Sequence, residues 1–272
     1  MKLSLTAAAV DLALLVCLCA PAAVAQSKLW VTVVDAMGAP IADLKAEDFS
    51  VLVDKSPRTV QKAAYIKDMV DVVVLMDTSA YAGMGRGEQI QRMAGFLIQQ
   101  LSEREQMAVV AYASNADLLQ DFTSSKPLLM RSTSGLKFGN DASVLDAVFA
   151  SVDAGFQNAP GRRVLVVIST GAEGFNKVKR TEIVDLAETR KVSIFGISLN
   201  GNKDPLEKLA EETGGAYFSG KEMRQPDALA KNLFAAFRGH YEIEIAGNGE
   251  ERRMKVEVKN AKEKLQVTQR RE

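Results

Sequence analysis

The chain has 272 residues, enough for one medium-sized domain and a smaller one, and 47% of them are hydrophobic and 25% charged. These proportions are those of an ordinary globular protein. The 34 Lys and Arg residues equal the 34 Asp and Glu residues, which argues against a general nucleic-acid or anionic-membrane binder.

Residues 1–25 have the pattern of a secretory signal peptide. Lys2 gives a positively charged start, Leu12 to Ala20 form a short apolar core, and Ala23-Val24-Ala25 is a small-x-small cleavage site. The core is too short to span a bilayer as a stable helix, and no later apolar stretch is long enough. We expect cleavage after Ala25 and no transmembrane helix in the mature chain.

Both cysteines of the chain, Cys17 and Cys19, lie inside this predicted signal. The mature protein is therefore expected to contain neither disulfides nor a catalytic thiol. Export without disulfides predicts a bacterial protein that is periplasmic or secreted. A lipid anchor at Cys17 or Cys19 is the less favoured alternative, because the preceding residues, Val16 and Leu18, are larger than such a site usually takes.

Two β-rich segments, residues 26–66 and 239–272, flank the centre of the chain. Neither has enough strands to bury a core alone, so we expect strands from both ends to pair into one small β-sandwich. Two separate hairpins are the alternative. The tail, Gln269 to Glu272, is expected to be frayed and exposed. The stretches that alternate in polarity are residues 30–34, 49–53, 241–245 and 254–258.

The central segment, residues 67–238, alternates short apolar runs with helical patterns. The helical patterns include Ile90, Met93, Ala94, Leu97 and Leu101, which form one apolar stripe. This alternation predicts an α/β domain with a doubly wound, mostly parallel, Rossmann-like sheet whose strands are buried on both faces. The apolar runs are Val70–Met76, Met107–Tyr112, Val164–Ser169 and Val192–Ser198.

A polar turn, Asp77-Thr78-Ser79-Ala80-Tyr81, follows the first apolar run directly. A carboxylate and two hydroxyls are thus expected at the carboxyl end of a buried strand. Open α/β sheets bind their ligands at this edge. The turn is therefore the candidate functional site.

At these residues the central segment resembles the von Willebrand factor type A domain family. The resemblance rests on DTSAY, on the strand VLVVIST and on the order of elements. The flanks, VTVVDAMGAPIADLKAEDFSV and YEIEI…MKVEVKN, are similar to those of a bacterial, exported group within that family. The resemblance implies the Rossmann-like fold and a metal-ion-dependent adhesion site for Mg²⁺ or Mn²⁺.

The adhesion-site pattern is incomplete here. The family pattern is Asp-x-Ser-x-Ser, then a Thr in a middle loop and an Asp after a later strand. Asp77 and Ser79 match, but Tyr81 replaces the second serine, Ala142 aligns with the threonine, and Thr170 with the final aspartate. One carboxylate holds Mg²⁺ poorly, because the ion dehydrates reluctantly. No cofactor is expected, with Mg²⁺ or Mn²⁺ at a rearranged Asp77 and Ser79 site as the alternative.

We therefore interpret the chain as a non-enzymatic protein–protein interaction module, adhesive or scaffolding, that uses the carboxyl edge of the sheet. The expected partner is a protein of unidentified kind. A metal-dependent adhesion domain is the first alternative. The residues expected to contact the partner are Asp77, Ser79, Tyr81, Asp141, Thr170 and Glu173.

An enzyme, such as a hydrolase, is the second alternative. The single histidine, His240, sits at a predicted domain junction, away from Asp77. A Ser-His-Asp hydrolase needs its histidine beside the nucleophile. The glycine-rich stretch Gly83 to Glu88 also fails as a dinucleotide loop, because Glu88 falls where the last glycine would be.

Overall fold

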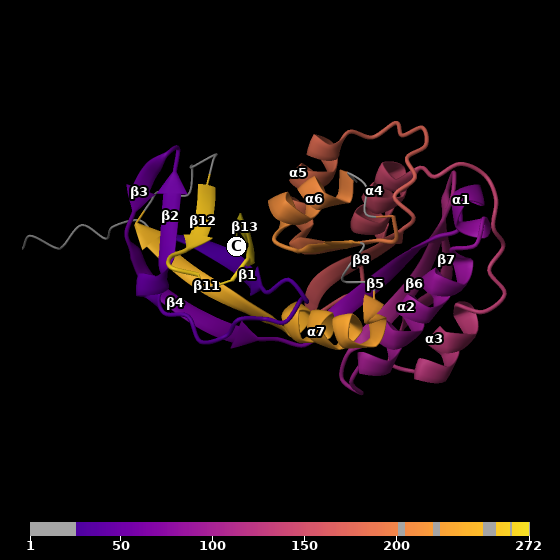
Figure 1. Ribbon diagram of the computed structural model, residues 1–272, viewed down its shortest axis with the longest axis horizontal. Coiled ribbons are helices and arrows are strands. Elements are labelled where there is room, and N and C mark those ends of the chain that lie inside the picture. The colour runs from indigo at the N-terminus through magenta and orange to yellow at the C-terminus, as the bar shows by residue number, and fades with distance from the viewer. Residues whose placement is uncertain (1–25, 201–204, 220–223, 247–253, 262, 272) are drawn as a thin grey trace, which may run out of the picture.

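The computed structural model of the protein describes residues 26–200, 205–219, 224–246, 254–261 and 263–271. A six-stranded sheet covered by helices lies beside two small antiparallel sheets (Figure 1). The strands of the large sheet are, in spatial order, β10 (Tyr217–Ser219), β9 (Val192–Ser198), β8 (Arg162–Ser169), β5 (Val70–Asp77), β6 (Gln106–Tyr112) and β7 (Ala116–Thr123).

The large sheet is parallel except for β7, which runs antiparallel to β6. Every residue of β5 is buried, as expected for a strand with helices on both faces. The helices of this domain are α1 (Ala80–Gly83), α2 (Gly87–Gln100), α3 (Lys126–Ser132), α4 (Val144–Ala154), α5 (Arg180–Arg190), α6 (Pro205–Thr213) and α7 (Pro226–Arg238).

Two apolar cores lie on opposite faces of this sheet. Side chains alternate along a strand, so Val74 and Met76 pack with α2, α3 and α7, whereas Val73 and Leu75 pack with α4, α5 and α6. The continuous apolar run of β5 therefore serves both cores. This arrangement confirms the predicted α/β fold class with its mostly parallel sheet.

The two small sheets, which lie together in Figure 1, share a third apolar core. The core joins strands from both ends of the chain: Leu29 and Val51 come from the beginning, and Ile243 and Val256 from the end. One sheet has the order β13 (Gln266–Arg271), β1 (Gln26–Val34), β11 (Gly239–Ala246) and β4 (Val60–Lys67); the other has β12 (Met254–Val258), β2 (Phe49–Val53) and β3 (Ser56–Arg58), and a short 3₁₀ helix (Ala46–Asp48) precedes β2.

The chain enters and leaves the α/β domain at one point. β4 leads into β5, α7 leads back into β11, and β4 pairs with β11 so that Lys67 lies opposite Gly239. The N–H of Asp68 donates to the carbonyl of Arg238 at 2.8 Å. Two chain crossings side by side thus connect the α/β domain to the small sheets.

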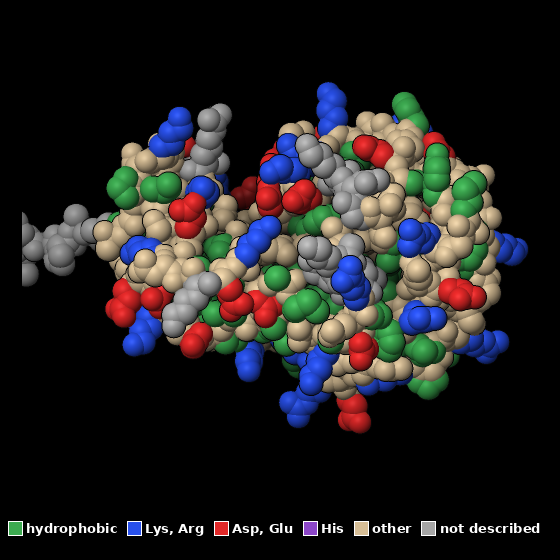
Figure 2. Space-filling view, viewed as in Figure 1, with side chains coloured by type: hydrophobic (Ala, Val, Ile, Leu, Met, Phe, Trp, Pro, Cys, Tyr) green, Lys and Arg blue, Asp and Glu red, His purple; other side chains and the backbone are tan. Residues whose placement is uncertain are grey.

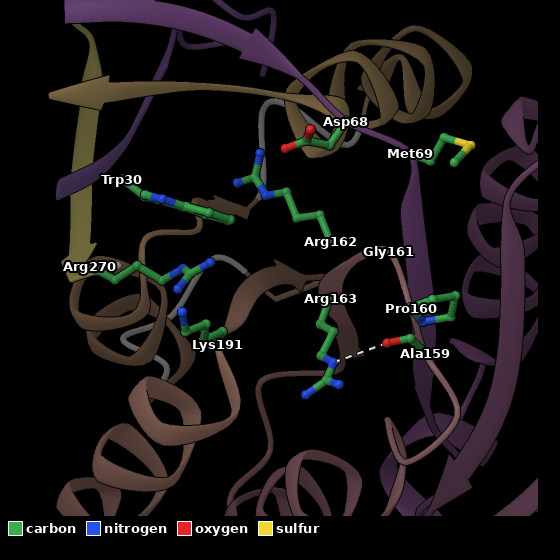
Figure 3. A pocket seen from close by; sticks show the side chains of 10 residues that line it. All are labelled: Trp30, Asp68, Met69, Ala159, Pro160, Gly161, Arg162, Arg163, Lys191 and Arg270. Carbon is green, nitrogen blue, oxygen red and sulfur yellow. Dashed lines mark hydrogen bonds between the residues drawn. The ribbon is translucent and has the colours of Figure 1, made fainter. Parts of the chain in front are cut away.

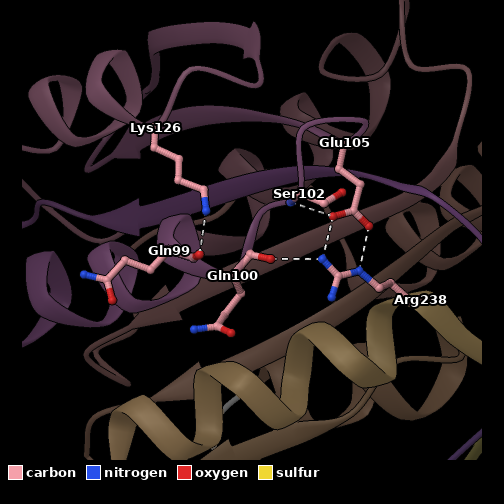
Figure 4. A network of polar contacts seen from close by, with 6 residues as sticks. All are labelled: Gln99, Gln100, Ser102, Glu105, Lys126 and Arg238. Carbon is pink, nitrogen blue, oxygen red and sulfur yellow. Dashed lines mark hydrogen bonds and ion pairs between the residues drawn. The ribbon is translucent and has the colours of Figure 1, made fainter.

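A partly buried ion pair ties α7 to the loop before β6 (Figure 4). Nε and Nη2 of Arg238 donate to the two carboxylate oxygens of Glu105 at 2.7 and 2.6 Å. Nη2 also donates to the carbonyl of Gln100, and the N–H of Ser102 donates to Glu105 at 3.0 Å. The guanidinium therefore fixes the last turn of α7 against the end of α2.

The four predicted strands of the central segment and the helix predicted around Ile90 to Leu101 are present, but several elements were not predicted. β7 and α3 lack a clear apolar period, and β7, at the sheet edge, has no buried residue. The predicted frayed tail is wrong for residues 269–271, which belong to β13 and pair with β1. That pairing satisfies the backbone groups at the free edge of β1 and buries Arg270, which is 5% exposed.

Several predictions are not tested by the fold. The predicted signal peptide, its cysteines Cys17 and Cys19, and Glu272 lie outside the described residues. The residue limits 26–66, 67–238 and 239–272 for the three segments stay a prediction.

On the face shown in Figure 2, basic and acidic side chains are interspersed, in keeping with the balanced composition.

Candidate functional site

The candidate site lies at the carboxyl ends of two neighbouring parallel strands. β5 ends at Asp77, and β8 beside it ends at Ser169. The loops that follow begin with Thr78 and Thr170. Two polar turns far apart in the sequence are thereby brought together at the edge where the sequence predicted them.

The carboxylate of Asp77 is fully buried and accepts three hydrogen bonds. Oδ1 accepts the N–H of Ser79 at 2.9 Å. Oδ2 accepts both the N–H and the hydroxyl of Thr170, at 3.0 and 2.6 Å. These bonds make Asp77 an acceptor of turn N–H groups, and they join the turn after β5 to the turn after β8.

Ser79 and Tyr81 lie at the start of the short helix α1. Ser79 is fully buried, and its Oγ has no hydrogen-bond partner within the described part of the chain. Tyr81 is 50% exposed. Its phenol therefore lies at the surface and does not take the place of a serine hydroxyl among the buried groups around Asp77.

Asp141 and Glu173 lie exposed on two loops that brace each other. Oδ2 of Asp141 accepts the N–H of Phe175 at 3.3 Å, and the N–H of Gly174 donates to the carbonyl of Ala142 at 2.8 Å. A Cβ at Gly174 would overlap the Asp141 carboxylate, so the absent side chain permits this close approach.

The same loops are also tied to the turn after β5. The N–H of Gly139 donates to the carbonyl of Thr78 at 3.0 Å. The N–H of Ala80 donates to the carbonyl of Asn140 at 2.9 Å. Asn140 has a left-handed backbone with φ 61°, which asparagine tolerates. Residues 77–84, 138–143 and 170–176 thus form one connected surface, which we call the Asp77 rim.

The donor set of the Asp77 rim does not fit a divalent cation. Mg²⁺ requires six oxygen ligands in octahedral geometry. Here the buried acid already accepts three hydrogen bonds, the Ala142 side chain has no oxygen, and Thr170 donates its hydroxyl proton to Asp77. The unpartnered Ser79 Oγ adds one neutral ligand. Among the described residues no group of three or more His, Cys, Asp or Glu could hold a metal.

Exposed apolar side chains on the Asp77 rim were missed from the sequence. Met84 is 79% exposed, Phe175 72% and Phe138 36%, in addition to Tyr81. The Phe138 ring covers the backbone near Gly83 and Gly87, where an added Cβ would meet it. Each of the three loops carries an apolar residue outside any periodic pattern. Such a residue is not needed for a core, so the sequence could have indicated that it is exposed.

A mostly parallel sheet covered on both faces by helices, with braced loops at its carboxyl edge, defines a doubly wound α/β domain. Residues 71–233 match the model of the von Willebrand factor type A domain, which is more than half of the chain. The chain belongs to the von Willebrand factor type A domain family, and the resemblance found in the sequence is confirmed.

Solved structures share this fold at low identity. A von Willebrand factor type A protein from Catenulispora acidiphila matches with TM-score 0.55 and 8% identity, over 91% of this chain and 74% of that one. The vWF domain of the type V pili tip protein Mfa5 from Porphyromonas gingivalis matches with TM-score 0.51 and 11% identity, over 63% and 97%. An aerotolerance-related membrane protein from Bacteroides fragilis matches with TM-score 0.50 and 13% identity, over 61% and 98%.

No curated protein matches the chain. Within the described ranges, none of the helices has the length and apolar character needed to cross a membrane.

Proposed function

We propose that the protein is an exported bacterial, non-enzymatic interaction module that binds a protein partner through the Asp77 rim without a bound metal. One observation carries the proposal. Tyr81, Met84 and Phe175 expose large apolar side chains on the rim, around a buried acid that is already hydrogen-bonded. Aromatic residues and methionine are enriched in protein interfaces.

The predicted contact residues take two roles in this proposal. Tyr81, Asp141 and Glu173 are accessible and would touch the partner. Asp77, Ser79 and Thr170 are buried and would position the loops that carry the contacts. Tyr81 would be the central contact, since truncating such aromatic residues often costs 2 kcal/mol or more, roughly a factor of 30 in affinity.

A non-enzymatic role is supported by where the only histidine lies. His240 contacts Arg162, the first residue of β8, whereas Asp77 lies beside the last residue of that strand. The histidine is thus at the opposite end of the sheet from the rim. A role outside the cytoplasm is in keeping with the predicted signal peptide and with the pilus-tip location given for the Mfa5 protein.

The proposal is tested with the immobilised protein and an envelope extract of its native host. Bound proteins are quantified by mass spectrometry for the natural protein, Tyr81→Ala and Leu128→Ala. Leu128 is the matched control because it is 48% exposed but lies on α3, outside the rim. We expect one or more partners to be retained by Leu128→Ala and reduced at least about tenfold by Tyr81→Ala.

The same experiment in EDTA and in Mg²⁺ distinguishes metal-free binding from the metal-dependent alternative. Retention that is equal in both supports metal-free binding. Loss of the partner in EDTA would instead favour a divalent cation at a rearranged Asp77 and Ser79 site. Equal recovery with Tyr81→Ala and the natural protein would contradict the role proposed for the rim.

A further inference from the structure

A cavity of about 490 Å³ lies at the opposite end of the sheet from the Asp77 rim, between the α/β domain and the small sheets (Figure 3). Of the described side chains that line it, four are basic, namely Arg162, Arg163, Lys191 and Arg270, and one is acidic, Asp68. The chain as a whole is balanced in charge, so this concentration of basic groups is local.

Arg162, the first residue of β8, is buried with 6% exposure. Its Nη1 donates to the carbonyl of Gly239 at 3.1 Å and lies 3.1 Å from Nδ1 of His240. Its Nε is buried and has no hydrogen-bond partner, and no carboxylate forms an ion pair with it, in the ranges that the structure describes. The charge of Asp68 acts to raise the pKa of Arg162, but no carboxylate among these residues contacts the guanidinium directly, and burying it in this way is costly.

His240 does not offset this charge. Burial, and then the charges of Arg162 and Arg270, lower the pKa of His240 to about 3, so its imidazole is neutral at pH 7. Nδ1 then accepts from Arg162, which requires the proton on Nε2. The 3.7 Å contact between His240 and Asp68 is therefore not an ion pair at neutral pH.

A second buried guanidinium stands nearby, against the same aromatic ring. The Cζ of Arg270 lies 4.1 Å from the centroid of the Trp30 ring, and that of Arg162 lies 5.9 Å away. The Trp30 ring also stacks on His240 at 4.3 Å. Burial, followed by the positive charge of Arg270, lowers the pKa of Arg162 to about 9. The two guanidiniums therefore repel each other, and an anion between them would offset that repulsion.

Lys191 adds a third cation at the edge of the cavity, and in Figure 3 it lies close to Arg270. It is exposed and caps the C-terminus of α5 with a left-handed φ of 56°. Arg163 differs from these groups: its guanidinium points away from the others, and it donates to the carbonyls of Ala159 and Arg190. The converging positive charge comes from Arg162, Arg270 and Lys191.

We propose that this cavity binds a small oxyanion, a carboxylate or a phosphate, held by Arg162 and Arg270 beside the Trp30 ring, with Lys191 at the edge. The planar guanidinium fork matches both kinds of oxyanion, which explains why two arginines and a lysine gather here. The site is separate from the Asp77 rim, so the inference does not depend on the function proposed for the rim.

The test uses Trp30 itself, because it is the only tryptophan of the chain and its fluorescence reports on the cavity without a label. The protein is titrated with inorganic phosphate and, separately, with succinate, up to about 50 mM. Sodium chloride keeps the ionic strength constant, since screening alone would change charge interactions. We expect a saturable change in Trp30 fluorescence and a matching rise in Tm with at least one anion.

Three variants locate the binding. Arg270→Gln should weaken it at least about tenfold, because charge-assisted hydrogen bonds are lost. Lys191→Asn should weaken it several-fold; it changes an exposed residue, and asparagine tolerates the left-handed backbone, so it remains informative if Arg270→Gln fails to fold. Arg163→Gln is the control: it also removes one positive charge from the cavity lining, but it should bind the anion within about twofold of the natural protein.

The two titrations also identify the class of ligand. Saturation by phosphate alone assigns a phosphate site, and saturation by succinate alone assigns a carboxylate site. No saturable response to either anion would overturn the proposal. It would also be overturned if Arg163→Gln weakened binding as much as Lys191→Asn, because the response would then reflect overall charge.

Discussion

Asp77 connects the ends of two strands through a single side chain. Its carboxylate accepts bonds from Ser79 on one loop and from Thr170 on another. These are the same positions at which the family pattern would supply metal ligands. In this chain Thr170 supplies a hydroxyl and an N–H in place of a second acid, so hydrogen bonds provide the link between the loops.

We therefore predict that Asp77→Ala destabilises the protein by about 2–4 kcal/mol, because it leaves buried donors of Thr170 unsatisfied. The loss should be the same in Mg²⁺ and in EDTA, as measured by urea unfolding. Asp141→Ala is the control, since Asp141 is exposed and accepts a single 3.3 Å bond; it should cost less than about 1 kcal/mol. A Mg²⁺-dependent rise in stability that Asp77→Ala abolishes would contradict the hydrogen-bonded interpretation.

At the scale of the elements, helix α7 is held by charge as well as by its apolar face. Arg238 pairs with both carboxylate oxygens of Glu105, which is 2% exposed, and its Cζ lies 5.1 Å from the centroid of the Phe234 ring. Burial alone would raise the pKa of Glu105, but hydrogen bonds from Arg238 and Ser102 outweigh it and lower the pKa below the usual 4.5.

A carboxyl group whose pKa is lowered in the folded state stabilises the protein above its unfolded pKa, and that stabilisation is lost as pH falls through the folded pKa. We expect Glu105→Gln to lower the free energy of unfolding by about 2–4 kcal/mol at pH 7, because the half-buried Arg238 loses its counter-ion. The difference from the natural protein should shrink below about pH 4.5.

Denaturant unfolding between pH 3 and pH 7 measures this dependence. Glu103→Gln, at an exposed position of the same loop, is the matched control and should stay within about 0.5 kcal/mol at every pH. A difference for Glu105→Gln that did not change with pH would show that packing, and not the ion pair, determines the stability at this position.

At the scale of the whole molecule, the two ends of the chain complete one core. Leu29 of β1 lies opposite Ile243 of β11, and both are fully buried. The small sheets also touch the α/β domain directly: the hydroxyl of Thr32 donates to the carbonyl of Gly214 at 2.8 Å, and the side chain of Gln266 bonds to both backbone groups of Tyr217. The α/β domain is therefore inserted between two chain segments that share one apolar core.

We predict that Leu29→Ala and Ile243→Ala each cost about 2–5 kcal/mol and that their effects couple by at least about 0.5 kcal/mol in a double-mutant cycle. Their side chains are direct cross-strand neighbours, so each truncation changes the cavity left by the other. Leu29→Ala combined with Val74→Ala, whose side chain lies in a different core, should be additive. Additivity of Leu29 and Ile243 would mean that the two ends do not form one packed unit.

Local periodicity was enough to predict the central sheet and the position of Asp77 at its carboxyl edge. Val70–Met76 is apolar at every position, which a strand buried on both faces requires, and Asp77 follows it directly. β7 and β13 could not be predicted in this way. Leu118 and Leu119 are exposed on an edge strand, and the residues of β13 alternate only weakly in polarity, so no local pattern marked them.

The contacts between distant residues required the folded chain. The sequence predicted Asp77 and Thr170 at the same edge of the sheet. Only the folded structure shows that the Asp77 carboxylate accepts hydrogen bonds from the N–H and the hydroxyl of Thr170. In the same way, Trp30, Arg162 and Arg270 are isolated residues in the sequence, and they meet because β1 and β13 pair at the amino end of β8. Periodicity reports which face of an element is buried, whereas a site depends on which elements become neighbours, and that is set by the packing of the whole chain.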